Sequence, residues 1–282
     1  MSLIEIRGLS FRYAGSEKPA LSNINLDIEK GDFVLVVGPS GGGKSTLCRC
    51  INGLIPQFYE GEYSGKVVVD GYEAAKTPTY LLSQIVGMVF QNPQNQLFAL
   101  SVEADVAFPL ENLGLPRDEI ISRIEEAMTM LNVQDLRDRS PFELSGGQQQ
   151  RVAIASVLAM KPKILILDEP TSYLDPVSSL SLLNNIDEIR RKLGLTVLLV
   201  EHRVDLAAAK ANRIVVIADG KLIFEGDHRK FFEEFDAHTF GVSTPKVTLL
   251  SRKLKARVKD WNMLCLSAEE FDQVVRRLVG RF

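Results

Sequence analysis

The glycine-rich segment GPSGGGKST, at residues 38–46, carries the residue types best suited to bind a phosphate group. It follows the apolar run FVLVV and precedes a helical stretch, which is the strand-loop-helix context of a phosphate-binding loop. The glycines let the backbone wrap so that its N–H groups face phosphate oxygens, and Lys44 adds a mobile positive charge for the β- and γ-phosphates. The Ser45 hydroxyl suits a magnesium ion. The predicted nucleotide-binding residues of this loop are Gly38, Ser40, Gly41, Gly42, Gly43, Lys44, Ser45 and Thr46.

Two acids, Asp168 and Glu169, end a second apolar run, ILIL at 164–167. At the carboxyl edge of a sheet, beside a phosphate loop, one carboxylate can hold magnesium while its neighbour addresses the attacking water. Successive strand residues point to opposite faces, so we assign the two acids different roles. Asp168 is the predicted metal ligand and Glu169 the predicted catalytic base. The competing interpretation is a pair of solvated acids at a strand exit.

The strands that must position these residues are recognisable by their apolar patterns. Short continuous apolar runs at 33–37, 164–167, 196–200 and 214–217 predict strands that are buried on both faces of a parallel sheet. Alternating apolar residues at 3–9 and 24–28 predict half-exposed antiparallel strands. The dipeptide Asp219-Gly220 predicts a hairpin turn at an antiparallel edge.

Between residues 92 and 160 the apolar spacing becomes helical, so we expect a helical insertion in the α/β domain. One helix is expected after Pro116, with an apolar face of Ile120, Ile121, Ile124, Ala127, Met128 and Leu131. A stripe at 182–193, ended by Gly194, predicts the crossover helix between two parallel strands. Near the chain end, Ser267 and Glu270 match a capping box that starts an amphipathic helix.

The composition is that of an ordinary globular protein, with 282 residues, 45% hydrophobic and 24% charged. The formal net charge of -3 gives no overall basic footprint for binding nucleic acid. Three cysteines without paired spacing predict neither a zinc site nor a disulfide framework, so we expect a reducing cytosolic compartment. We find no secretory signal pattern and no run of roughly 20 apolar residues that could span a bilayer.

The segment LSGGQQQR, at 144–151 and 17 residues before Asp168, makes the chain resemble the ATP-binding-cassette (ABC) ATPases. It is similar to the family's signature motif, and residues 38–46 and ILILDE resemble its Walker A and Walker B motifs. Gln91 resembles the Q-loop glutamine, Asp175 the D-loop aspartate and His202 the switch histidine. Tyr13 is placed like the aromatic residue that stacks on adenine. His228 and His238 match no such position, and we interpret them as surface residues.

The resemblance implies an α/β phosphate-loop NTPase fold, with a mixed parallel core sheet, an antiparallel β subdomain, a helical insertion and a small C-terminal helical extension. We expect an ABC ATPase domain over 1–235, its helical subdomain over about 92–160, and an extension over 236–282. The implied cofactors are ATP and Mg²⁺. The implied catalytic residues are Glu169, His202 and Gln91, and the implied metal site comprises Ser45, Gln91 and Asp168.

A second phosphate-binding helix N-terminus is predicted at Ser145, Gly146, Gly147 and Gln148. One phosphate loop does not need two such termini from the same chain. In the family, the signature of one subunit closes over the nucleotide held by its partner, so the resemblance implies a homodimer or a heterodimer with a second ABC ATPase. Taken alone, the segment would be interpreted only as a helix N-cap with small residues.

The segment FQNPQNQLF, at 90–98, resembles the Q-loop region of ATPases from energy-coupling-factor (ECF) importers, including the cobalt and nickel type. That likeness implies a transporter subunit at the cytoplasmic face of the membrane, bound to a transmembrane T component, with a separate S component that captures a vitamin or metal ion. A simple polar loop is the alternative for this segment.

Residues 245–282 carry a local charge of +5, which leaves -8 for residues 1–244. The basic tail would suit a nucleic-acid arm, but the apolar stripe of its last helix favours a helix that packs on a neighbour. Members of the ECF branch carry C-terminal helices that hold two ATPases together, so the resemblance implies a dimer contact. We therefore expect no nucleic-acid partner. The alternative function is a soluble ABC ATPase that acts on DNA or ribosomes. A phosphate-loop kinase or GTPase would leave LSGGQQQR unexplained.

Overall fold

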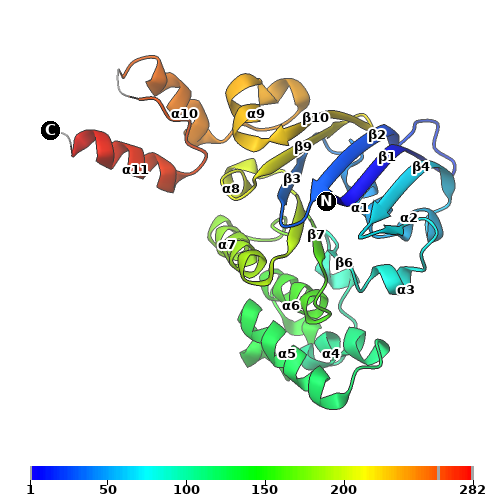
Figure 1. The fold of residues 1–282 in the computed structure, drawn as a ribbon. Helices are drawn as coiled ribbons and strands as arrows, with labels where there is room; N and C mark the ends of the chain where they lie inside the picture. The colour runs from blue at the N-terminus through cyan, green and yellow to red at the C-terminus, as the bar shows by residue number, and fades with distance from the viewer. Residues whose placement is uncertain (1, 259–260, 281–282) are drawn as a thin grey trace.

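The computed structural model describes residues 2–258 and 261–280 and contains a larger and a smaller sheet (Figure 1). The larger sheet has the strand order β10-β9-β3-β8-β7-β6, in which β10 pairs antiparallel with β9 and every other pairing is parallel. Its strands are β3 (Phe33–Val37), β6 (Val86–Val89), β7 (Ile164–Asp168), β8 (Thr196–Val200), β9 (Arg213–Ala218) and β10 (Lys221–Asp227). The predicted parallel strands and the hairpin at Asp219-Gly220 are thus present.

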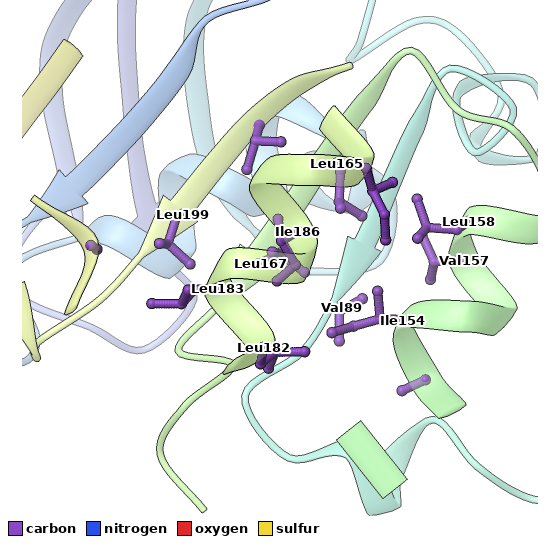
Figure 2. Packing of buried hydrophobic residues seen from close by; sticks show 14 of the residues in the cluster. Val89, Ile154, Val157, Leu158, Leu165, Leu167, Leu182, Leu183, Ile186 and Leu199 are labelled. Atoms are coloured by element: carbon purple, nitrogen blue, oxygen red, sulfur yellow. The ribbon is translucent and has the colours of Figure 1, made fainter. Parts of the chain in front are cut away.

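The central strands are apolar throughout because both faces of the larger sheet are covered. Leu165 and Leu167 of β7 pack in one hydrophobic cluster, whereas Ile164 and Ile166 pack in another on the opposite face. Figure 2 shows the first cluster, in which Leu167 and Leu199 lie against side chains of α6 (Gly146–Ala159) and α7 (Pro176–Leu193). This alternation directs Asp168, at the end of β7, toward the second cluster.

The second cluster joins the larger sheet to a smaller antiparallel one. The smaller sheet has the order β2-β1-β4-β5, built from β1 (Ser2–Tyr13), β2 (Leu21–Glu29), β4 (Gly61–Val69) and β5 (Tyr72–Glu73). In β1 and β2, buried apolar side chains alternate with more exposed ones, as the sequence predicts. The helix α1 (Lys44–Ile51) fills the space between the sheets with Leu47, Cys48 and Ile51. All three cysteines, Cys265 included, are free and buried.

The helical insertion packs against the first cluster and lies below the sheets in Figure 1. It contains α4 (Val102–Asn112), α5 (Arg117–Leu131) and α6. On α5, Ile124, Met128 and Leu131 are buried as predicted, but Ile121 is half exposed, so its predicted place on the buried face is wrong. Ile121 lies at the edge of the apolar stripe, which is wider than the buried face of α5.

Four other α-helices in the described residues are short. They are α2 (Leu54–Gln57), α3 (Thr79–Leu82), α8 (Val204–Ala207) and α9 (His228–Glu234). The histidine that opens α9, His228, is buried, so its predicted place on the surface is wrong. Burial lowers the pKa of its imidazole. Within the described residues, no helix is long and apolar enough to span a membrane.

The C-terminal helices α10 (Lys246–Lys255) and α11 (Ala268–Val279) project beyond α9 in Figure 1. They share a small cluster of their own around Trp261, Cys265 and Val274, while Val242 and Leu266 of the extension belong to the main cluster. Ser267 caps α11 as predicted. The second hydrogen bond of the predicted capping box is replaced, because the Glu270 carboxylate accepts from the Leu266 N–H at 2.9 Å and not from the Ser267 N–H. Lys259, Asp260 and Arg281, which contribute to the calculated tail charge, lie outside the described residues.

Candidate functional site

A cleft of about 690 Å³ lies at the carboxyl ends of β3, β7 and β8. The phosphate loop lines it from Ser40 to Thr46. Four other predicted site residues also line it: Tyr13, Gln91, Glu169 and His202. A volume of this size suits a nucleotide-sized ligand. The structure therefore brings residues from five separate parts of the sequence to one site.

The phosphate loop requires glycine at its two ends. Gly38 has φ +139°, and a Cβ there would lie 1.9 Å from the carbonyl oxygen of Ile217. Gly43, the N-cap of α1, has φ +111°, and a Cβ would lie 2.5 Å from the carbonyl oxygen of Ala20. Because both positions combine a left-handed backbone with close contact, the loop can follow this path only with glycine.

Lys44 begins α1 and is almost completely buried. Its ammonium donates to the carbonyl oxygens of Gly38 at 3.0 Å and Pro39 at 2.9 Å. Burial lowers the pKa of the Lys44 ammonium, and the carboxylates of Glu169 and Asp168 oppose this shift. The positive charge of Lys44 thus lies between the loop backbone and two acids, where it can bind phosphate.

Ser45 and Asp168 meet at the base of the cleft. The Ser45 hydroxyl donates to Oδ1 of Asp168 at 3.1 Å, and the Asp168 side chain has little exposure, at 4% for the residue. Burial raises the pKa of the Asp168 carboxyl, while the Ser45 hydrogen bond lowers it. A hydroxyl and a carboxylate form the oxygen donor set that Mg²⁺ prefers. In the described part of the chain, no group of three or more His, Cys, Asp or Glu residues could hold a metal ion, so Mg²⁺ would also need phosphate and water ligands.

Glu169, the predicted catalytic base, is held by neighbouring side chains. Three side chains contact its carboxylate: Gln91 donates to Oε2 at 2.8 Å, Ser172 donates to Oε2 at 3.2 Å, and His202 Nε2 lies 3.0 Å from Oε1. Glu169 has φ +51°, a left-handed conformation that is uncommon for a residue with a side chain. This turn directs the Glu169 carboxylate away from Asp168 and into the cleft, as the separate predicted roles require.

Strand register explains why Gln91 meets Glu169. In the parallel pair of β6 and β7, Val89 lies opposite Leu167, and Gln91 and Glu169 each come two residues after this pair. The neighbouring strand β8 continues into His202 on the other side of β7. Neighbouring parallel strands end at the same sheet edge, so three sequence-predicted residues converge at one point.

Tyr13 lines the cleft, and its hydroxyl makes polar contacts with neighbouring residues. Its hydroxyl lies 3.2 Å from Thr46 Oγ1 and accepts from Arg49 at 3.2 Å. The Arg49 guanidinium also lies over the Tyr59 ring, 5.0 Å from its centroid. Stacking of Tyr13 on adenine remains a prediction.

The signature segment forms a separate surface. Ser145 and Gln148 form a capping box at the start of α6, with hydrogen bonds of 3.4 and 3.0 Å. Among the described residues, the cleft takes none of its lining from 145–148. Gly147 instead adjoins Leu174, because a Cβ there would lie 2.8 Å from the Leu174 side chain. Asp175 caps α7, and hydrogen bonds with Ser178 lower the pKa of its carboxyl.

The sequence motifs indicate no role for Glu201 or Arg49, and they do not indicate that Ser172 contacts Glu169. Ser172 contacts Glu169 directly, and Glu201 binds the segments that carry Ser172 and His202. Glu201 directly precedes His202, and an acid at the end of a buried apolar strand is a usable signal. Arg49 lies on the first helix after the phosphate loop, and nothing in its sequence surroundings indicates that it contacts Tyr13.

Comparison with known families gives one family match. The family model described as ABC transporter matches residues 21–172. Among curated proteins, a putative ABC transporter ATP-binding protein of Pyrococcus horikoshii is 46% identical, over 91% of each chain. The energy-coupling factor transporter ATP-binding protein EcfA1 of Streptococcus thermophilus is 41% identical, over 90% of each chain.

Two solved structures of ABC proteins match the fold of this chain. The cbiO1 protein of Clostridium perfringens, described as part of the ABC transporter complex cbiONQ, matches with a TM-score of 0.76 and 32% identity, over 91% of this chain and 96% of that one. A dimeric ATP-binding cassette in a post-hydrolysis state, bound to ADP and Pi, matches with a TM-score of 0.71 and 30% identity, over 80% of this chain and 99% of that one. These matches confirm the predicted fold class.

Proposed function

Because this chain belongs to the ABC transporter family of ATP-binding proteins, we propose that it is the ATP-hydrolysing subunit of an ECF-type importer for a vitamin or for cobalt or nickel ions. The 41% identity to EcfA1 and the structural match to cbiO1 support this branch of the family. In this proposal the chain binds and hydrolyses ATP, while membrane subunits encoded separately carry the cargo.

ATP would lie along the cleft, with its phosphates on the phosphate loop and α1 N-terminus and its base near Tyr13. Lys44 would bind the β- and γ-phosphates, and the loop N–H groups would hold the remaining phosphate oxygens. Ser45, Asp168 and Gln91 would hold Mg²⁺, directly or through water. Bound there, Mg²⁺ would neutralise charge that develops on the phosphates.

Hydrolysis would take place at the Glu169 carboxylate. Gln91, Ser172 and His202 hold this carboxylate at the cleft wall, so it has a fixed direction in which to accept a proton from the attacking water. His202 would bind the γ-phosphate. The observed contact requires a proton on Nε2 of His202 when Glu169 is ionised, and the same N–H could donate to a phosphate oxygen.

The active unit would be a dimer. The signature residues Ser145, Gly146 and Gly147 lie at a helix N-terminus, which favours phosphate binding, yet they do not line the cleft of their own chain. They adjoin the segment that leads to Asp175 and so form a second surface. The signature of each subunit would close over the ATP of the other, as the dimeric cassette with a bound nucleotide supports.

An apolar groove beside the Q-loop is the observation that carries the transporter proposal. It has a volume of about 300 Å³ and is lined in part by Phe90, Phe98 and Phe108. Phe98 and Phe108 are both exposed, with ring centroids 4.6 Å apart, and Leu100 nearby in sequence is 91% exposed. Clustered exposed aromatic side chains are typical of a partner site. We assign this groove to a helix of the membrane T component.

The extension formed by α10 and α11 would hold the two ATPase subunits together. Several of its basic side chains are engaged within the chain: Arg252 donates to carbonyl oxygens of α9 and Phe235, Lys255 pairs with Glu233, and Arg276 pairs with Asp272. Paired charges are less available to nucleic acid, which favours the dimer contact over a nucleic-acid arm.

Purification from membranes tests the proposed function. The tagged chain, extracted in mild detergent, should recover a second ABC ATPase or a second copy together with integral membrane subunits. Recovery with nucleic acid or ribosomes, and without an integral membrane protein, would instead support the soluble alternative.

Two variants sharpen this test. Phe98→Asp in the groove should lose the membrane subunits while it retains ATP binding. Ile121→Asp, which places the same charge on an exposed position of α5, should retain them. Equal recovery with both variants would contradict the assignment of the groove.

A further inference from the structure

A buried glutamate, Glu201, directly follows β8 and lies outside the cleft lining. It is 2% exposed, and each of its carboxylate oxygens accepts two hydrogen bonds. Oε1 accepts from the Thr171 hydroxyl at 2.6 Å and from the Thr171 N–H at 3.2 Å. Oε2 accepts from the N–H groups of His202 and Arg203, at 3.1 and 3.2 Å. All four donors therefore come from two short segments, 30 residues apart.

These two segments supply two of the three side chains that contact the Glu169 carboxylate. Thr171 precedes Ser172, whose hydroxyl contacts one carboxylate oxygen of Glu169, and His202 contacts the other. The Glu201 carboxylate thus connects the backbone that carries Ser172 to the backbone that carries His202. A change in the length or hydrogen bonding of Glu201 would move the Ser172 and His202 contacts of the catalytic base at once.

Arg203 connects the same segments from a second side. Its guanidinium donates at 3.0 Å to the Leu174 carbonyl oxygen and at 3.0 Å to the Ser179 hydroxyl. The Glu201 N–H donates at 3.3 Å to the Val36 carbonyl oxygen, so the connection extends to the strand that leads into the phosphate loop. The hydrogen-bond donors that compensate the buried charge of Glu201 belong to the same segments that carry Ser172 and His202.

We propose that Glu201 is a positioning residue that sets the geometry of Ser172 and His202 around the Glu169 carboxylate. This inference rests on the proposed role of Glu169 as catalytic base. A carboxylate is required because only it presents acceptors to both segments. In Glu201→Gln the amide nitrogen must face either the Thr171 N–H or the N–H groups of His202 and Arg203, which places donor against donor.

The first measurement is steady-state ATP hydrolysis by the full-length chain. Because small displacements of a catalytic group cost up to about 10²-fold in rate, we expect Glu201→Gln to lower kcat by ~10- to 100-fold. KM for ATP should change by less than ~3-fold, because the phosphate loop is intact. A kcat for Glu201→Gln within ~2-fold of the unmodified protein would overturn the proposal.

A double-mutant cycle separates positioning from stability. Glu201 acts through Glu169, so adding Glu201→Gln to Glu169→Gln should lower the residual single-turnover rate by no more than ~2-fold. A further loss as large as in the single variant would show a merely structural role and contradict the proposal. If Glu169→Gln itself retains normal turnover, the assignment of the base fails first, which is a separate result.

Thr171 provides a second route if Glu201→Gln does not fold. Thr171→Val removes only the donor at 2.6 Å and should lower kcat, whereas Thr171→Ser keeps that donor and should restore most of it. Asp187→Asn, at a buried acid of α7 outside the site, should change Tm but not kcat. Equal kcat values for the two Thr171 variants would overturn the proposal.

Discussion

The hydroxyl of Ser45 donates a 3.1 Å hydrogen bond to Oδ1 of Asp168, across 123 residues of sequence. It joins the start of α1 to the end of β7 and places a phosphate loop next to a buried carboxylate. The contact therefore defines the proposed metal side of the nucleotide site, with Glu169 directed to the other side.

Asp168→Asn tests the cost of this buried charge. Burial raises the pKa of the Asp168 carboxyl above its ordinary 3.8. The stability that the protonated carboxyl contributes to the folded protein is therefore fully present below the ordinary pKa, and it is lost as pH rises through the pKa of the folded state. We predict that Asp168→Asn raises the nucleotide-free Tm near pH 7 by about 2–4 °C. The gain should shrink as pH falls toward ~4.

The same variant should lose the extra stabilisation that Mg²⁺ adds to bound ATP, because one metal ligand is missing. Thermal melts with ATP, with and without Mg²⁺, measure this. Glu17→Gln, at an exposed acid, is the control and should show neither effect. A lower Tm for Asp168→Asn near neutral pH would contradict the sign of the argument.

Lys44→Ala should weaken nucleotide binding. The ammonium is the one side-chain cation of the phosphate loop, and loss of a charge-assisted hydrogen bond typically costs about 1.5–3 kcal/mol. We therefore expect the Kd for ATP to rise by ~10- to 100-fold in equilibrium titrations. Lys30→Ala, at an exposed lysine, should bind ATP normally. Unchanged affinity in Lys44→Ala would argue against the phosphate-loop assignment.

A mixing experiment tests whether the signature acts on the partner's nucleotide. Lys44→Ala and Ser145→Arg should each abolish hydrolysis in a homodimer, because every site lacks either its lysine or its signature. A mixed dimer regains one complete site, so equal mixing should restore about one quarter of the normal rate. No recovery in confirmed mixed dimers would contradict assembly of the site from two chains.

The exposed face of α10 tests the proposed dimer contact of the extension. Leu249 and Leu250 are both exposed apolar residues, and changing both to Glu should weaken association without ATP in sedimentation experiments. Lys253→Glu changes the net charge by the same amount on an exposed position of the same helix and should have a smaller effect. Equal association of all three proteins would exclude α10 as the contact.

The site illustrates what the sequence can predict in this fold. Strands β3, β7 and β8 were predictable because burial on both faces makes them apolar throughout. Glu169 and His202 follow the ends of such strands, and parallel strands end at the same sheet edge, so their proximity also followed.

Other features depend on tertiary contacts that no local pattern reports. His228 opens α9 with a polar side chain, yet it is buried under neighbouring elements. Ile121 matches the helical period of α5, but it lies at the edge of the apolar stripe, which is wider than the buried face. The role of Glu201 depends on hydrogen bonds to Thr171, 30 residues earlier, which only the folded backbone places within reach.

The turnover of Glu169→Gln tests the central claim most directly, because it removes the ionised oxygen that would accept the proton and leaves the shape of the cleft unchanged. Steady-state hydrolysis should fall by at least ~10²-fold, while the Kd for ATP stays within ~3-fold of the unmodified protein. Near-normal hydrolysis by this variant would contradict Glu169 as the catalytic base and the mechanism built on it.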